Sequence, residues 1–313
     1  MRRSLVISAT VRMASNKSYR KISLLKRQML DFEQIQRQQQ QQISSDRETR
    51  DSNKSWHYSH RSPYRRNVLD LLELFGKKAL TSHIVADVNM KWVNHILRCY
   101  ESSGQRVTVT AILIKAISVA QKSHPAGRTF PLPGSRTVTY NDVVAGFTVE
   151  RMVDGEAIVF FGEIEQSQEK SLPELALALE SYARGDIMSL PKLRQQMLFS
   201  RMPGLLRRAV LIVASWIPCL RQMCMKSTFG LSNLGALGAS ACFGPSVCTS
   251  VFGVGASTDR VMARDGAIHI EPAMTLALSF DQRVMDAGQA ALFLRDVKGL
   301  MEGVLGDYID VPV

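Results

Sequence analysis

A change in composition near residue 64 constrains the fold of this chain more than any single motif does. The first 63 residues are polar and basic, and they include an unbroken glutamine run from Gln38 to Gln42. Such a segment offers too little apolar surface to offset the entropy cost of ordering it. We therefore expect residues 1–63 to be a disordered basic, glutamine-rich segment and residues 64–313 to form one folded domain.

Charge changes at the same boundary. The net charge is +11, and residues 1–66 hold 15 Lys and Arg against 5 Asp and Glu, which leaves 24 against 23 for the rest. A body that bound nucleic acid would carry its own basic face, so we expect no nucleic-acid partner. The first 30 residues hold eight basic residues and no acid, which is typical of a transit peptide and equally of a disordered leader. We expect a cytoplasmic protein, with the mitochondrial matrix as the alternative if this segment is cleaved.

The cysteines and the apolar runs indicate neither a metal site nor a membrane span. The five cysteines form no CxxC pair, and no histidine lies at zinc-finger spacing from them. We therefore predict no metal site and interpret the cysteines as buried free thiols. No apolar run reaches the roughly 18–20 residues that span a bilayer.

Hydrophobic periodicity in residues 65–300 alternates between helical and strand spacing. Ser171 and Glu174 form a capping box that opens one helix, and Asp154-Gly155 is a common hairpin turn. The resulting order predicts a mixed α/β domain in one layered body. The predicted helices are 65–79, 93–100, 109–120, 171–184 and 290–300, and the predicted strands are 83–90, 142–151, 156–164, 228–233, 246–254 and 273–280.

Two C-terminal motifs are the most specific signals in the chain. The first is Thr228-Phe-Gly-Leu-Ser-Asn-Leu-Gly-Ala-Leu-Gly238, and the second is Leu278-Ser-Phe-Asp-Gln-Arg-Val-Met-Asp286. Together they resemble the catalytic domain of the 2-oxoacid dehydrogenase acyltransferases (E2), which carry a "TFTISNLG" strand about fifty residues before an "LSxDHRxxDG" motif. Ser232 and Gln282 are 50 residues apart. The resemblance covers roughly residues 67–310.

This resemblance implies a mixed-sheet layered fold like that of chloramphenicol acetyltransferase. It further implies a homotrimer whose active sites lie in channels between subunits, with an acyl-CoA or an acyl carrier as partner. It implies no permanently bound cofactor, because the coenzyme A thioester is a substrate. By position, Ser232 corresponds to the donor to the tetrahedral oxyanion, Asp286 to the supporting carboxylate, and Asn233 and Arg283 to substrate-binding residues.

The base position departs from the family pattern, because Gln282 replaces the histidine that removes the proton of the acceptor thiol. An amide accepts no proton near pH 7, although it can hydrogen-bond a substrate. Loss of a general base typically lowers the rate about 10²–10⁴-fold. Two interpretations therefore stay open: an acyltransferase with weakened or altered catalysis, and a catalytically inactive structural or interaction subunit. His83 and His269 are alternative bases, each less favoured than a packed or solvated histidine.

Simpler structural roles exist for two of these residues. Ser232 could satisfy a backbone group in the turn near Gly235. Asp286 and Gln289 form a good capping box for the last helix, and a capping role does not exclude an ion pair to Arg283.

The chain also departs from the family outside the motifs. No lipoyl-type lysine turn occurs in the N-terminal segment, and Ala287 stands where the family has glycine. The segment at about 189–226 is longer than expected and holds seven Lys and Arg without an acid. It is either a helix hairpin packed on the body, which we favour, or a surface for anionic membranes or an acidic carrier.

Overall fold

The computed structural model describes residues 63–312 except 77–78, 246 and 265. The predicted disordered segment, residues 1–63, lies outside the described residues apart from Pro63. Within the described chain, the predicted order of helices and strands is largely confirmed, beginning with α2 (Pro63–Leu74).

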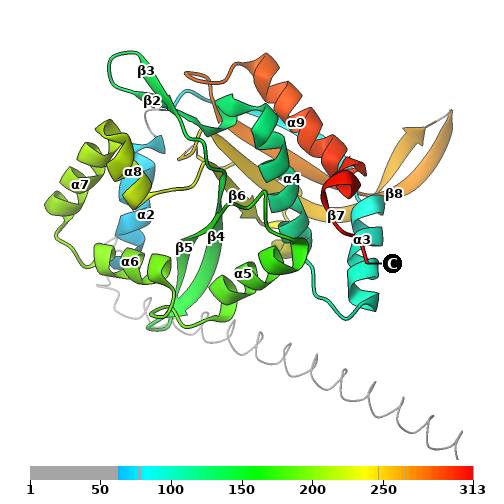
Figure 1. Ribbon diagram of the computed structural model, residues 1–313, viewed down its shortest axis with the longest axis horizontal. Coiled ribbons are helices and arrows are strands. Elements are labelled where there is room, and N and C mark those ends of the chain that lie inside the picture. Colours follow the sequence, from blue (N-terminus) through cyan, green and yellow to red (C-terminus); the bar gives the residue numbers. More distant parts are fainter. Residues whose placement is uncertain (1–62, 77–78, 246, 265, 313) are drawn as a thin grey trace, which may run out of the picture. The chain divides into compact units, whose positions relative to one another are not determined.

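A six-stranded mixed sheet forms the centre of the fold, in the order β1-β8-β7-β6-β4-β5 (Figure 1). Strand β6 lies parallel to both of its neighbours, and the other pairs are antiparallel. The strands are β1 (Thr81–Asn89), β4 (Val144–Val153), β5 (Glu156–Glu165), β6 (Phe229–Asn233), β7 (Ser250–Arg264) and β8 (Ala267–Asp281).

Four helices build the main hydrophobic core with the sheet. Helix α4 is buried along most of its length, and its side chains contact apolar residues of α3, α5, α9 and the central strands. Thr108 caps α4 by accepting a hydrogen bond from the backbone of Ala111, and the predicted capping box Ser171–Glu174 opens α5. The bounds are α3 (Lys91–Ser102), α4 (Val109–Ser123), α5 (Leu172–Arg184) and α9 (Ala287–Met301).

Residues 239–244 lie against strand β7. The backbone of Ala256 donates to the carbonyl of Ala239, so the two segments are joined by main-chain contact. A Cβ atom on Gly253 would collide with the carbonyl of Cys242, and one on Gly255 would collide with that of Ser240. Only glycine permits this approach, which fixes the segment that follows the Ser-Asn-Leu-Gly motif.

Two details of the fold differ from the sequence prediction. Strands β7 and β8 extend past the predicted ends into a long hairpin arm, visible at the edge of Figure 1. Its apolar residues, such as Val261 and Ile268, are exposed, so the arm lacks the one-sided pattern that predicts a strand. A short hairpin of β2 (Thr129–Leu132) and β3 (Arg136–Thr139) was also not predicted. The Asp154-Gly155 turn is as predicted, with both residues at positive φ.

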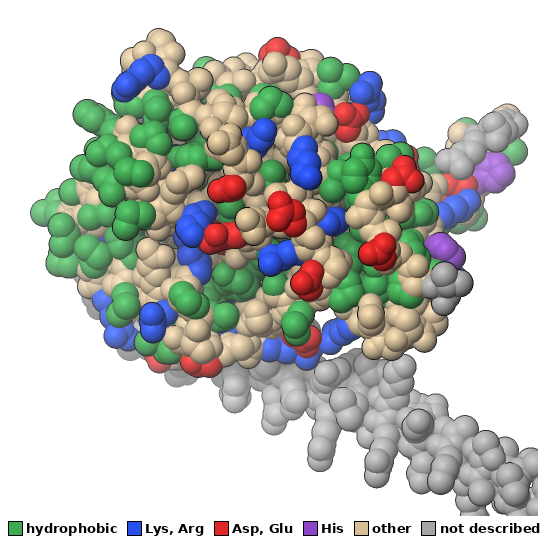
Figure 2. Space-filling view, viewed as in Figure 1, with side chains coloured by type: hydrophobic (Ala, Val, Ile, Leu, Met, Phe, Trp, Pro, Cys, Tyr) green, Lys and Arg blue, Asp and Glu red, His purple; other side chains and the backbone are tan. Residues whose placement is uncertain are grey.

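The segment at 189–226 folds into three helices, α6 (Pro191–Ser200), α7 (Gly204–Trp216) and α8 (Pro218–Cys224). Arg207 is buried and pairs with Asp70 of α2 at 2.5 Å, and Arg208 pairs with Asp70 and Glu73. Both arginines are engaged with acids of α2, which favours the packed-hairpin interpretation. The outer face of this segment is apolar, and Figure 2 shows hydrophobic side chains gathered over it. In the part of the chain described, no helix is both long and apolar enough to cross a bilayer.

Candidate functional site

Ser232 lies near the end of β6, on the opposite face from its buried neighbour Leu231. Its register partner on β7 is Gly253. Among the described residues, the Ser232 hydroxyl has no hydrogen-bond partner. It therefore does not satisfy the turn near Gly235, and it is available as a donor to a ligand.

Asn233, predicted to bind substrate, is used by the fold itself. Its amide nitrogen donates to the Thr110 hydroxyl at the start of α4, at 3.0 Å. Its amide oxygen accepts the backbone N–H of Gly235, also at 3.0 Å. The side chain thus fixes the end of β6 against α4 and holds the turn that follows Ser232.

Gln282 follows the last residue of β8 and is exposed. Its backbone N–H donates to the carbonyl of Leu80, and its side-chain nitrogen donates to the hydroxyl of Ser82 on β1. The amide oxygen has no hydrogen-bond partner within the described residues. The position can therefore still accept a hydrogen bond from a substrate, but it cannot take up a proton.

Arg283 is held in place by Asp281, a buried residue that the sequence analysis did not single out. The guanidinium donates to both carboxylate oxygens of Asp281, at 3.0 Å to Oδ1 and 2.6 Å to Oδ2, and the backbone N–H of Arg283 donates to Oδ1 as well. The carboxylate also accepts the N–H of Leu80. A buried strand ending in Asp, with Arg two residues later, was the available sequence signal for this pair.

Asp286 is the N-cap of α9. Its carboxylate accepts the backbone N–H of Gln289 at 2.8 Å, and the Gln289 side chain returns to the backbone of Asp286. The predicted capping box is therefore present. In the described structure, the ion pair of Arg283 is made with Asp281 and not with Asp286.

Ser232 and Gln282 do not meet within one chain. Ser232 lies level with Gly253 of β7, which in turn pairs with Ala277 of β8. Gln282 is five residues further along β8, which corresponds to about 17 Å along the strand and about 10 Å across two strand spacings. A site that uses both residues needs a second copy of the chain.

Neither alternative base, His83 or His269, is placed to act as the base at position 282. His83 is exposed, bonds the Ser279 hydroxyl at 2.8 Å and contacts the Phe243 ring edge-on. Strand alternation places His83 on the face of β1 opposite to Ser82, the partner of Gln282. His269 lies on the hairpin arm, about 40 Å along β8 from position 282.

The sequence of the C-terminal part matches a known acyltransferase domain. The profile of the 2-oxoacid dehydrogenases acyltransferase catalytic domain matches residues 221–306, which include Ser232 and Gln282. The chain is 26% identical over 205 residues to the dihydrolipoyllysine-residue acetyltransferase component of the acetoin cleaving system of Bacillus subtilis, covering 64% of this chain and 43% of that protein. The chain spans less than half the length of the curated relatives that it matches.

Solved structures share the fold at low sequence identity. A probable dihydrolipoamide acetyltransferase of Listeria monocytogenes has a TM-score of 0.60 and 16% identity, covering 82% of this chain and 99% of that chain. The cubic core of the pyruvate dehydrogenase multienzyme complex gives a TM-score of 0.61 and 16% identity, covering 81% and 94%. The predicted mixed-sheet layered fold is confirmed. Residues 221–306 are thus similar in sequence to the 2-oxoacid dehydrogenases acyltransferase catalytic domain, and the chain has a fold like that of the two solved structures.

Proposed function

We propose that this chain transfers an acyl group from coenzyme A or a carrier-bound thioester to an acceptor, with catalysis weakened or altered by Gln282. The observation that carries the proposal is the match of residues 221–306 to the acyltransferase catalytic domain. The unpartnered hydroxyl of Ser232 supports it, because the oxyanion of acyl transfer needs a donor that the fold has left free.

The reaction forms one bond and breaks another at the thioester carbon. The acceptor, which we take as a thiol, adds to this carbon, and the electron pair of the carbonyl moves onto oxygen. The Ser232 hydroxyl donates a hydrogen bond to this oxyanion. Collapse of the intermediate breaks the bond to the coenzyme A sulfur, which leaves as a thiolate and takes up a proton.

The proton of the acceptor thiol has no base at position 282. The free amide oxygen of Gln282 can orient the thiol by accepting its S–H, but deprotonation then falls to solvent. The reaction therefore depends on the fraction of acceptor that is already thiolate, and its rate rises with pH up to the pKa of that thiol.

The site is formed between copies of the chain, in a homotrimer. The separation of Ser232 from Gln282 along the sheet supports this assembly, because one chain does not bring them together. The similarity to a structure that forms the core of a multienzyme complex is consistent with self-assembly. We assign residues 64–313 to this domain and the cytoplasm to its location, with the mitochondrial matrix as the alternative.

A non-catalytic structural or interaction subunit is the second candidate. The hydrogen bond from Gln282 to Ser82 favours it, since the side chain at the base position is held by its own fold. In such a subunit Asp281 and Arg283 would maintain the shape of a site that has lost its chemistry.

The two candidates differ in whether the chain transfers acyl groups. We expect slow transfer from at least one member of a panel of radiolabelled acyl-CoAs to a thiol, amine or alcohol, detected as labelled product. Ser232→Ala should abolish that transfer, whereas Ser102→Ala, at the exposed end of α3, should not change it. Absence of both transfer and acyl-CoA binding would favour the structural subunit.

A further inference from the structure

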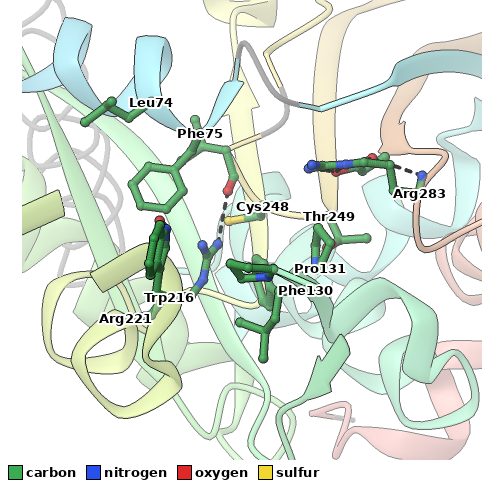
Figure 3. Close-up of a pocket in the computed structure, with 14 residues that line it drawn as sticks. Leu74, Phe75, Phe130, Pro131, Trp216, Arg221, Cys248, Thr249 and Arg283 are labelled. Atoms are coloured by element: carbon green, nitrogen blue, oxygen red, sulfur yellow. Dashed lines mark hydrogen bonds and ion pairs between the residues drawn. The ribbon is translucent and has the colours of Figure 1, made fainter. Parts of the chain in front are cut away.

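Arg221 on α8 is a buried cation that the proposed acyl transfer does not use. The residue is 7% exposed, and its guanidinium lies between the rings of Phe75 and Phe130, 5.0 and 3.9 Å from their centroids. Figure 3 shows it at one side of a pocket, with Trp216 beside it. Among the basic residues of the segment at 189–226, it is the buried one without a carboxylate partner in the described structure.

The hydrogen bonding of Arg221 is incomplete. One terminal nitrogen donates to the carbonyl of Val247 at 3.3 Å, while the Nε atom is buried and has no partner. A buried guanidinium normally has its N–H groups satisfied and its charge paired, because both are expensive to remove from water. The guanidinium of Arg221 can therefore donate further hydrogen bonds to an anionic ligand.

Within the described part of the chain, no neighbouring acid neutralises this charge near pH 7. Burial raises the pKa of the Cys248 thiol to about 12, and burial also raises the pKa of the Tyr140 hydroxyl, so both groups are neutral. Asp281 lines the same pocket, but its carboxylate is occupied by Arg283 and by two backbone N–H groups. Among the residues that the structure describes, the charged groups lining the pocket are Arg221, Arg283 and Asp281, with a net charge of +1.

The pocket is large enough for a small organic molecule. Its volume is about 390 Å³, and its walls come from α2, β2, α7, α8, the strand-preceding residues 247–249 and the end of β8. Aromatic rings supply the apolar surface, and Thr249 lies between Arg221 and Arg283 in Figure 3. Apolar walls with a few convergent polar groups are typical of small-molecule sites.

We propose that this pocket binds a small organic monocarboxylate whose apolar body lies against Phe75, Phe130 and Trp216 and whose carboxylate pairs with Arg221. A carboxylate fits better than a phosphate, because one net positive charge balances a monoanion and leaves a dianion partly unpaired. The site is distinct from the Ser232 and Gln282 positions, and its occupancy can be measured without any acyl transfer. Asp281 and Arg283, which flank Gln282 in the sequence, also line this pocket.

The test is isothermal titration calorimetry on the full chain with benzoate, phenylacetate and hexanoate, each paired with its neutral amide. We expect at least one acid to bind saturably, at least tenfold more tightly than its amide, and to raise the melting temperature. Arg221→Met should weaken that binding at least tenfold, and Arg221→Lys should retain part of it. Arg295→Met, which removes an exposed arginine on α9, is the matched control and should bind as the wild type does.

Several results would overturn the proposal. They are the absence of saturable binding by all three acids, equal affinity for acid and amide, and unchanged binding by Arg221→Met. Tighter binding of inorganic phosphate than of any carboxylate would also overturn it, since the ligand class would then be wrong. If Arg221→Met failed to fold, the comparison of acid with amide and the Arg221→Lys titration would still decide the outcome. Acyl transfer can fail in every one of these proteins without affecting this test.

Discussion

The course of the proposed acyl transfer depends on one side chain, because Gln282 occupies the position that we propose for the base. The neighbouring groups keep an ordered arrangement: Asp281 is buried and holds Arg283, and Asp286 caps α9. On our proposal, this position offers no proton acceptor, although the residues around it are ordered. A general base can therefore be introduced at this position without changing the residues around it.

Replacing Gln282 by His should raise thiol acyl transfer about 10²-fold, because a general base then removes the thiol proton. The measurement is the initial rate of product formation from acyl-CoA, as a function of pH. The gain should disappear when Ser232→Ala is added, because the oxyanion loses its donor. Gln282→Asn is the matched control, since it keeps an amide and adds no base. A high wild-type rate that falls in Gln282→His would contradict this mechanism.

The cysteines provide a second test at the residue scale. Cys248 is buried with its pKa raised to about 12, so roughly 10⁻⁴ of it is thiolate at pH 8. Cys219 is exposed. We expect iodoacetamide to modify Cys219 in the native protein and to leave Cys248 intact, as read by peptide mass spectrometry. Rapid native modification of Cys248 would mean that the pocket around Arg221 opens.

Among the elements, α7 is joined to the body by charge as well as by packing. Arg207 is buried between α7 and α2 and contacts Asp70, which is also buried. Burial of both ions makes the pair sensitive to removal of either partner, because the remaining charge is left uncompensated. The helix therefore depends on this pair for its position, whatever its outer apolar face contacts.

The variant Asp70→Asn should lower the free energy of unfolding by about 3 kcal/mol, because Arg207 would stay buried without its counter-ion. Urea denaturation followed by circular dichroism measures the change. Glu180→Gln removes the acid of an exposed pair with Arg106 and should change stability by less than about 0.5 kcal/mol. Equal effects of the two variants would contradict the burial of the Asp70 pair.

The sequence predicted elements well where one face of each is buried and poorly where both faces are exposed. Helix α3 and strand β6 carry clear apolar faces, so their periodicity sufficed. The β7–β8 arm exposes Val261 and Ile268, which hides its strand pattern. The pocket around Arg221 brings together residues that are distant in sequence, so their spacing could not predict it. The Asp281–Arg283 pair had a signal in its spacing, but the sequence does not show that Asp281 is buried.

For the whole molecule, the central issue is whether two copies complete one site. Ser232 and Gln282 lie at different levels of the same sheet, so the proposed acyl transfer requires assembly. We expect sedimentation of the full chain at micromolar concentration to give a trimer. A strict monomer would contradict the shared site but not the fold.

Mixing variants tests the shared site directly. The double variant Ser232→Ala/Gln282→His lacks the oxyanion donor, and the wild type lacks the base, so both should be slow. Co-refolded mixtures should exceed both parents, because some interfaces then join a wild-type Ser232 to a variant copy that carries the base. If the mixtures are no faster than the average of the two parents, Ser232 and the base at position 282 do not act together across an interface.

The pairing of β1 with β8 has a consequence for how the chain acquires its structure. Thr81 pairs with Asp281 and Asn89 pairs with Ala273, so the two strands are separated by nearly the whole folded domain. Contacts of such long sequence separation form slowly, since a large loop must close before they stabilise the chain. During synthesis, the backbone hydrogen-bonding groups of β1 therefore cannot pair with β8 until almost the entire domain has left the ribosome. The strand that bears Ser82, the partner of Gln282, thus cannot take its place in the sheet before β8 has been made.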